Sequence, residues 1–155
     1  MTFTATKPKC VETNNGVAWA TVIKKNGVVL AHVSNDGRGA CDDHEWLDKS
    51  EADAFIAEAE AFNAKLKENL YAGFAKKDHR GQPGADFCSA YVESLMQQAE
   101  SDAKFAADCK KHIVVQLEGQ PGYSMVKNKR PTPELVAQLK KQYPGIKILN
   151  PGFDK

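Results

Sequence analysis

The sequence predicts an α+β domain with a mostly antiparallel sheet of about five strands, a central αα-hairpin and a short C-terminal helix. Two pairs of short, β-branched segments surround residues that favour tight turns. Two long segments with apolar residues at helical spacing lie between those pairs. Helices that are grouped, rather than alternating with strands, are typical of the α+β class. The length of 155 residues predicts that residues 1–155 form a single domain.

The first hairpin has the strongest local signal. Residues 1–8 are polar, which predicts a frayed terminus or an edge strand. Residues 17–23 are dense in β-branched and aromatic types, and residues 28–33 are expected to form the return strand. Between them, Asn26-Gly27 can adopt two successive positive φ angles, as a two-residue hairpin turn requires.

Two helices are predicted in the middle of the chain. Ser50 is expected to cap the first helix, with the negative charge of Asp53 in its first turn, and the helix is expected to end near residue 69. A loop over residues 76–85 contains two glycines and a proline and separates it from the second helix, over residues 86–110.

The C-terminal part predicts a second hairpin, a short helix and a last strand. Residues 113–117 and 123–127 flank a Pro-Gly turn. Residues 132–134, Thr-Pro-Glu, combine a cap, a proline at the first helical position and an acid in the first turn. A second Pro-Gly pair is expected to end this helix before a strand over residues 146–149.

The charge is close to balanced but unevenly distributed. The net charge is +1, which excludes a uniformly charged binder of nucleic acid. Residues 42–70 carry a net charge of −6 and residues 111–155 carry +5. These segments are either two solvated faces, or the basic one meets an acidic partner. No apolar stretch approaches the ~20 residues of a membrane span, and the first 15 residues hold no signal-peptide core. Four scattered cysteines then predict reduced thiols in a cytoplasm.

The segment of residues 35–46 is the most informative for function, because loops on a rigid scaffold commonly carry binding residues. In one interpretation it is a structural turn, in which Asn35 and Asp36 cap their own backbone and glycines supply positive φ. Trp46 and Leu47 are expected to pack under the start of the helix and hold the loop in one shape. In the other interpretation, its polar side chains form a binding surface made of Asn35, Asp36, Arg38, Asp42, Asp43 and His44.

Motifs near the two ends of the chain carry a resemblance. They are the Asn26-Gly27 turn, residues 33–39 with the sequence VSNDGRG, and a C-terminal TPE…YP…ILN pattern between residues 132 and 150. This arrangement resembles small uncharacterised proteins of tailed bacteriophages, although Ala40 stands where their loop often has a second glycine. The resemblance implies a phage origin, a place in the host cytoplasm and action by binding a host protein. It implies no reaction.

Two sets of side chains are candidate metal ligands. Two Cys-x-x-His pairs could together supply four ligands to a tetrahedral zinc ion: Cys41, His44, Cys109 and His112. The alternative is that Cys109 lies on an apolar helix stripe and His112 is solvated. The loop's acids could instead hold Mg²⁺ or Mn²⁺ for phosphoester hydrolysis, using Asp36, Asp42, Asp43, His44 and Glu45. The plainer alternative is an acidic run that complements a helix N-terminus.

A basic segment in the C-terminal hairpin suggests a nucleic-acid contact. Lys127, Lys129 and Arg130 could bind phosphates, with Tyr123 as the one aromatic residue nearby. The alternative is a solvated strand edge, where lysine discourages pairing with another chain.

The sequence therefore predicts a binding protein rather than an enzyme. It is expected to engage and inhibit a host protein, with a possible role against a host defence, and to need no cofactor. The first alternative is a metal-dependent nuclease or phosphodiesterase, and the second is a nucleic-acid-binding protein. No sequence feature sets the oligomeric state.

Overall fold

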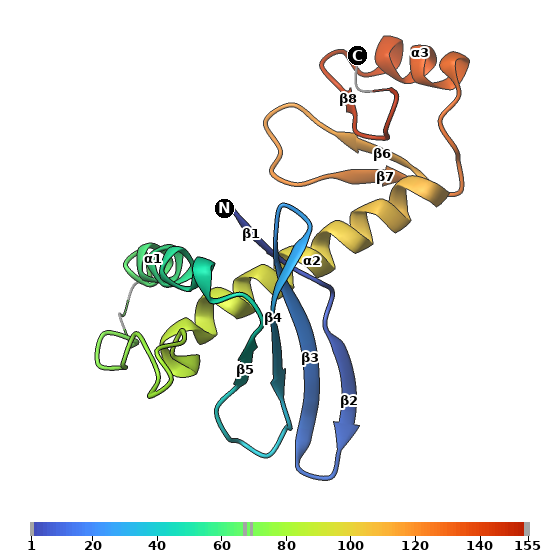
Figure 1. The fold of residues 1–155 in the computed structure, drawn as a ribbon. Coiled ribbons are helices and arrows are strands. Elements are labelled where there is room, and N and C mark those ends of the chain that lie inside the picture. Colours follow the sequence, from blue (N-terminus) through green and yellow to red (C-terminus); the bar gives the residue numbers. More distant parts are fainter. Residues whose placement is uncertain (1, 67, 69, 154–155) are drawn as a thin grey trace. The chain divides into compact units, whose positions relative to one another are not determined.

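The computed structural model describes residues 2–66, 68 and 70–153 (Figure 1). It confirms the α+β class, with three α-helices and antiparallel sheets in the part of the chain that it describes. The chain divides into two compact units, Met1–Glu100 and Ser101–Lys155, each of which is described by itself. The single domain expected over residues 1–155 stays a prediction.

Unit 1 contains a five-stranded antiparallel sheet (Figure 1). Its central strand, β3 (Gly16–Lys25), pairs on one side with β4, and β4 pairs in turn with β5. On its other side β3 pairs with two short strands, β1 along its second half and β2 along its first half. The remaining bounds are β1 (Phe3–Ala5), β2 (Lys9–Thr13), β4 (Val28–Asn35) and β5 (Asp43–Trp46).

The predicted first hairpin is confirmed as β3 and β4. Lys25 pairs with Val28 across the turn, where Asn26 has φ 51° and Gly27 has φ 83°. A two-residue hairpin turn requires two successive positive φ angles, and Asn-Gly is a pair of residues that adopts them readily. The edge strand expected within residues 1–8 is β1, whose Phe3 is 1% exposed.

Two strands escaped the sequence prediction. All five residues of β2 are exposed, so they lack the alternation of apolar and polar residues that marks a half-buried strand. Strand β5 lies inside the segment that was expected to be one loop leading into a helix. In β5, His44 and Trp46 point inward while Asp43 and Glu45 point outward, and the carboxylates concealed this two-residue period.

The first helix differs from its prediction at both ends. A 3₁₀ turn, Lys49–Glu51, comes first, and its cap is Asp48, whose carboxylate accepts a hydrogen bond from the Ser50 amide at 2.9 Å. The predicted cap Ser50 instead donates its hydroxyl to the same carboxylate, at 2.7 Å. Helix α1 (Ala52–Asn63) then ends six residues before the predicted position, and residue 69 itself lies outside the described residues.

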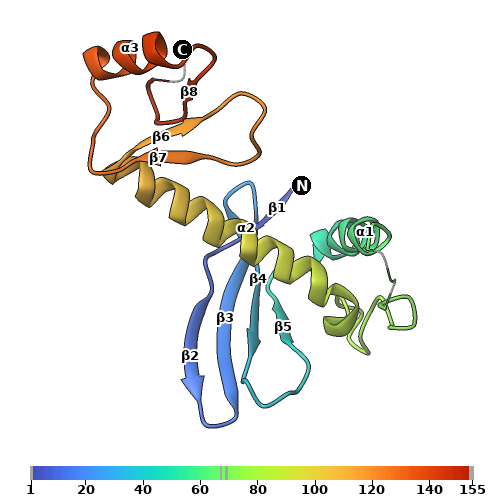
Figure 2. The same cartoon turned by 180° about the vertical axis from the view of Figure 1, so that it is seen from behind.

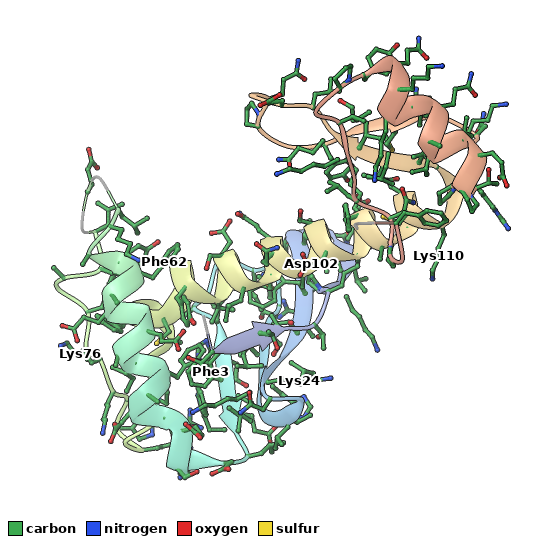
Figure 3. All side chains as sticks on the ribbon, turned by 90° about the horizontal axis from the view of Figure 1, so that it is seen from above. Phe3, Lys24, Phe62, Lys76, Asp102 and Lys110 are labelled. Atoms are coloured by element: carbon green, nitrogen blue, oxygen red, sulfur yellow. The ribbon has the colours of Figure 1, made fainter. Side chains whose placement is uncertain are left out.

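Helices α1 and α2 (Ala85–Lys111) contribute to one apolar core on the inward face of the sheet of unit 1 (Figures 2 and 3). Phe55 of α1 is its centre, because three rings lie with centroids 5.1 Å from its own, those of Phe3, Trp46 and Tyr91. The Tyr91 hydroxyl also donates to Glu58 at 2.5 Å and so joins the two helices. The buried apolar residues of this core include Ile23, Leu30, Ala31, Val33, Ile56, Ala59, Phe87, Val92 and Leu95.

Unit 2 contains a three-stranded antiparallel sheet, helix α3 and the last residues of α2, 101–111, and it follows the sequence prediction closely (Figure 1). Strand β6 (Ile113–Gln116) lies between β7 (Ser124–Val126) and β8 (Lys147–Ile148). Helix α3 (Pro133–Gln142) begins as predicted, because the Thr132 hydroxyl accepts from the Leu135 amide at 3.3 Å. Its core consists of Ile113, Val115, Val136, Leu139, Ile146 and Ile148.

A buried asparagine holds the strands of unit 2 to the end of α2. Asn150 is 1% exposed and accepts a hydrogen bond from the Val114 amide at 2.7 Å. Its side-chain nitrogen donates to the carbonyls of Cys109 and His112, each at 2.9 Å. Backbone groups therefore use both donor positions of this buried amide and one of the two acceptor positions of its oxygen.

The search for membrane-crossing helices gives a negative result in the part of the chain that the structure describes. Even α2, with 27 residues, does not combine the length and the apolar composition that a span requires.

Candidate functional site

The β4–β5 loop, residues 36–42, is shaped by its own side chains. Asn35 accepts a hydrogen bond from the Gly37 amide at 2.7 Å, and Asp36 accepts one from the Arg38 amide at 2.9 Å. Gly37 and Gly39 have φ angles of 74° and 80°. These are the self-capping turns and positive φ values that the structural interpretation predicted, so that prediction is confirmed.

Asn35 also fixes the far side of the loop. Its side-chain nitrogen donates to the Ala40 carbonyl and to the Asp42 carboxylate, both at 3.0 Å. The tip of the loop lies against the first residues of β3, since a Cβ at Gly37 would stand 2.7 Å from the carbonyl carbon of Val17. The loop is therefore held from within by hydrogen bonds and from outside by backbone packing.

A hollow of about 230 Å³ lies beside this loop. It is lined by Asp42 from the loop, Trp19 from β3, and three residues of α2, namely Ser89, Glu93 and Met96. The three helical residues are three to four positions apart, so they project from one face of α2. The Trp19 and Met96 side chains are partly buried and pack against the core of unit 1.

The hollow is acidic, and neutral side chains hold its two carboxylates. Asn35 donates to Asp42, and Gln97 donates to Glu93 at 3.2 Å. Neither carboxylate has an ion pair among the described residues. Within the loop, a hydrogen bond to Asp86 raises the pKa of the exposed Cys41 thiol, which keeps the thiol protonated and a poor nucleophile.

His44 does not belong to the binding surface that the sequence predicted. It is 3% exposed and projects inward from β5, opposite Val33, because alternate residues of a strand face opposite sides. Burial lowers the pKa of its imidazole, against the opposing influence of nearby carboxylates such as Asp42 and Asp78. Neither ring nitrogen has a hydrogen-bond partner among the described residues. The prediction that the side chain of His44 points outward was therefore wrong.

The remaining predicted loop residues stay near the surface. Arg38, Asp36 and Asp43 are exposed, whereas Asn35 and Asp42 are partly buried. The Nε atom of Arg38 lies 3.9 Å from a carboxylate oxygen of Asp36. An exposed ion pair of this kind contributes little to stability. The expected packing of Trp46 is confirmed, since it is 5% exposed, but Leu47 is 56% exposed.

Among the described residues of each unit, the predicted ligands do not form a candidate metal site. No group of three or more His, Cys, Asp or Glu side chains that could hold an ion is found among the described residues. This covers the zinc set, Cys41, His44, Cys109 and His112, and also the acidic loop. His112 uses its Nδ1 to accept a hydrogen bond from the Asn128 amide at 3.0 Å. The zinc and magnesium predictions gain no support from these positions.

The basic segment of unit 2 is exposed, but its aromatic neighbour is occupied. Lys127, Lys129 and Arg130 are all exposed. The Tyr123 hydroxyl donates to Asp108 at 3.0 Å, and its ring packs edge-on against Phe105 with centroids 5.3 Å apart. Tyr123 is therefore a structural residue here rather than a platform for stacking a base.

The larger hollow in unit 2 is a weaker candidate. It measures about 360 Å³ and is lined mainly by the last residue of β6 and the turn after it, residues 116–120, with Gly145 and Lys147. Its two charged residues, Glu118 and Lys147, have opposite signs, and it contains none of the predicted site residues. Size alone does not give a hollow a ligand preference, so the hollow of unit 1, whose two charged lining residues have the same sign, is the stronger candidate site.

Sequence reasoning missed most of that hollow. Trp19 was assigned only to a strand, although the two-residue period places it on the same face as Ile23. Ser89, Glu93 and Met96 follow a helical period that was used only to find the apolar stripe of α2. The available signal was a row of mixed polar and apolar residues at the edge of the apolar stripe. The pairing of that stripe with the loop, however, depends on the tertiary fold.

Comparison of the chain with known protein families, curated proteins and solved structures finds no match. The resemblance to proteins of tailed bacteriophages consequently stays a prediction.

Proposed function

We propose that this protein acts by binding another protein, and that the β4–β5 loop is its contact surface. The single observation that carries the proposal is the bracing of the loop, in which Asn35 and Asp36 hold the backbone while Arg38 remains exposed. A surface loop that is already ordered loses little conformational entropy on binding, which favours affinity. The adjoining hollow gives the surface a concave part where a side chain of the partner can enter.

The identity of the partner follows the resemblance seen in the sequence. A small phage-type protein in a host cytoplasm would meet host proteins, and binding without catalysis would act as inhibition, for example of a defence function. Neither the nuclease nor the nucleic-acid alternative is favoured by a specific observation on the described residues.

The test is quantitative capture of a partner from a bacterial host lysate, followed by affinity measurement with the purified partner. Arg38→Ala and Asp43→Ala should weaken binding by roughly tenfold or more, because interface energy concentrates in a few residues and arginine is frequent among them. Both variants should keep the wild-type melting temperature, since exposed polar changes usually alter stability by less than ~0.5 kcal/mol.

Arg130→Ala is the matched control, because it removes an exposed arginine from unit 2. Equal loss of binding in the Arg38 and Arg130 variants would indicate that general charge attraction, and not a specific contact with the loop, accounts for the binding. Full binding by both loop variants would contradict the proposal.

A further inference from the structure

We propose that the acidic hollow beside the β4–β5 loop is a binding site for an organic ammonium cation, with the lysine side chain of a protein partner as its source. The source rests on the proposed function, whereas the preference for a cation rests on the hollow alone. The five lining residues, Trp19, Asp42, Ser89, Glu93 and Met96, supply each kind of contact that such a cation uses.

The charge of the hollow selects the sign of the ligand. Asp42 and Glu93 come from two different elements and line one space, and no lysine or arginine lines it with them. Their hydrogen-bond partners, Asn35 and Gln97, are neutral amides that orient the carboxylates without cancelling their charge. An ammonium group is attracted by both carboxylates, whereas a phosphate or carboxylate ligand is repelled by them.

Trp19 adds the contact that distinguishes an organic cation from a metal ion. Indole is the aromatic group that attracts cations most strongly, and the attraction grows when the cation is partly desolvated. The backbone of Trp19 is fixed on both sides, since it pairs with Cys10 of β2 and with Asn35 of β4. The thioether of Met96 adds a polarizable apolar surface suited to methylene or methyl groups.

Size and hydrogen-bonding capacity narrow the ligand further. A hollow of about 230 Å³ is smaller than the ~300–1,000 Å³ of sites that enclose drug-sized ligands. It suits an ammonium with a few carbon atoms rather than a nucleotide. The Ser89 hydroxyl and the two carboxylates are three acceptor groups, so each of the three N–H donors of a lysine ammonium can have its own partner.

The two tryptophans of the chain provide the readout. In a ¹H–¹⁵N spectrum, the indole signal of Trp19 should shift and saturate on addition of n-butylammonium, choline or acetyl-Gly-Lys-Gly-amide. The signal of Trp46, which is 5% exposed in the core, should stay in place as an internal control. We expect dissociation constants of about 1 mM for the small amines, as few atoms make contact.

Neutral analogues of the same shape test the role of charge. These are n-butanol, 3,3-dimethylbutan-1-ol and the norleucine peptide acetyl-Gly-Nle-Gly-amide, and none should shift Trp19 at the same concentrations. Equal shifts with charged and neutral ligands would overturn the inference, because they would show a merely apolar pocket. The lysine peptide and the free amines distinguish the two sources: saturation by the peptide supports the partner's side chain, and saturation by free amines alone overturns that source.

Charge-removing variants complete the test. Asp42→Asn and Glu93→Gln together should weaken binding at least tenfold, and both keep an oxygen that accepts the bonds from Asn35 and Gln97. Glu12→Gln together with Glu45→Gln is the matched control, since it also removes two negative charges, from exposed positions of unit 1 outside the hollow. Binding by the double variant equal to the wild type would overturn the inference.

The outcomes separate this inference from the proposed function. Ammonium binding with full partner capture by Arg38→Ala and Asp43→Ala would retain the cation site and reject the loop as the contact surface. Loss of capture in those variants without ammonium binding would do the reverse.

Discussion

His44 and Asn150 are both buried polar residues, and they differ in what their polar atoms contact. Asn150 bonds three backbone groups, whereas the ring nitrogens of His44 have no partner among the described residues. Desolvation without a compensating hydrogen bond disfavours the charged imidazolium, which is why burial lowers the pKa of His44. We therefore expect His44 to make the stability of the protein depend on pH, and we expect truncation of Asn150 to lower the stability.

We expect the free energy of unfolding to fall as the pH is lowered from 7.5 towards 5. The unfolded chain takes up a proton at His44 near pH ~6.5, while the folded chain resists it until a lower pH, so acid favours unfolding. Urea titrations at pH 7.5, 6.5 and 5.5 measure this dependence. His44→Leu should reduce the slope, whereas His32→Gln, which changes an exposed histidine on the neighbouring strand, should not. An unchanged slope in His44→Leu would show that another group titrates.

A separate acid effect is expected at lower pH from Asp78. Burial of this carboxylate raises its pKa, but hydrogen bonds from Gln82 and Arg80 outweigh that effect and bring the pKa down to about 2. Its contribution to stability is present above the unfolded value near ~3.9 and is lost as the pH falls towards 2. The window above pH 5 therefore reports on His44 without interference from Asp78.

Asn150→Ala should destabilise unit 2 strongly. It leaves the amide of Val114, a buried residue, without its partner, and an unsatisfied buried group costs about 1–3 kcal/mol. Hydrogen exchange at Val114 and Val115 should accelerate accordingly. Gln138→Ala, an exposed change on α3, is the control and should have little effect. Wild-type exchange rates in Asn150→Ala would show that water replaces the amide at no cost.

At the scale of elements, the β4–β5 loop contains two glycines that allow backbone strain from a positive φ to be separated from steric overlap of a new Cβ. Gly37 and Gly39 have nearly equal positive φ angles, so an alanine meets the same backbone strain at both. Only at Gly37 would the new Cβ approach backbone, at 2.7 Å from Val17, whereas nothing lies within 4 Å at Gly39.

Gly37→Ala should consequently lower stability by about 1–3 kcal/mol more than Gly39→Ala, the usual cost of overpacking. Thermal unfolding of both variants measures the difference. Equal melting temperatures of the two variants would show that the loop tip does not press against β3. The loop would then be held only by the hydrogen bonds of the Asn35 and Asp36 side chains.

Elements with complete local signals could be predicted from the sequence. The Asn26-Gly27 turn and the Thr132 cap are short-range effects in which neighbouring residues set the backbone, and both were found. Strand β5 was missed because its inward residues, His44 and Trp46, alternate with carboxylates that imitate a polar loop. Burial of His44 depends on tertiary packing, and the hollow that Trp19 and Glu93 line depends on the position of α2 beside the sheet. No local sequence pattern contains either.

At the scale of the whole molecule, the two units differ in charge. Residues 1–100 contain eleven basic and fifteen acidic residues, and residues 101–155 contain ten basic and five acidic ones. The acidic candidate site thus belongs to the unit with a net charge of −4, which attracts cations beyond direct contact. Association of a basic partner should slow as salt is added, since the Debye length is only ~8 Å at physiological ionic strength.

The prediction of a single domain is tested by cooperativity. Both tryptophans lie in unit 1, so tryptophan fluorescence follows that unit, whereas far-ultraviolet circular dichroism follows helices throughout the chain. One domain predicts coincident denaturant transitions by the two probes. It also predicts that Asn150→Ala shifts the fluorescence transition. Separate transitions would establish two independent folding units.

Different residues of the β4–β5 loop hold its backbone and form its exposed tip, and this has a consequence for protein engineering. Its frame consists of Asn35, Asp36 and Gly37, which are committed to hydrogen bonds and close packing, while the next positions, Arg38, Gly39 and Ala40, are exposed. A frame that does not depend on the side chains at its tip tolerates their replacement. A library that randomises residues 38 and 40 and retains the frame would therefore yield folded members in high proportion. The scaffold could then be selected for new targets in the manner of an antibody loop.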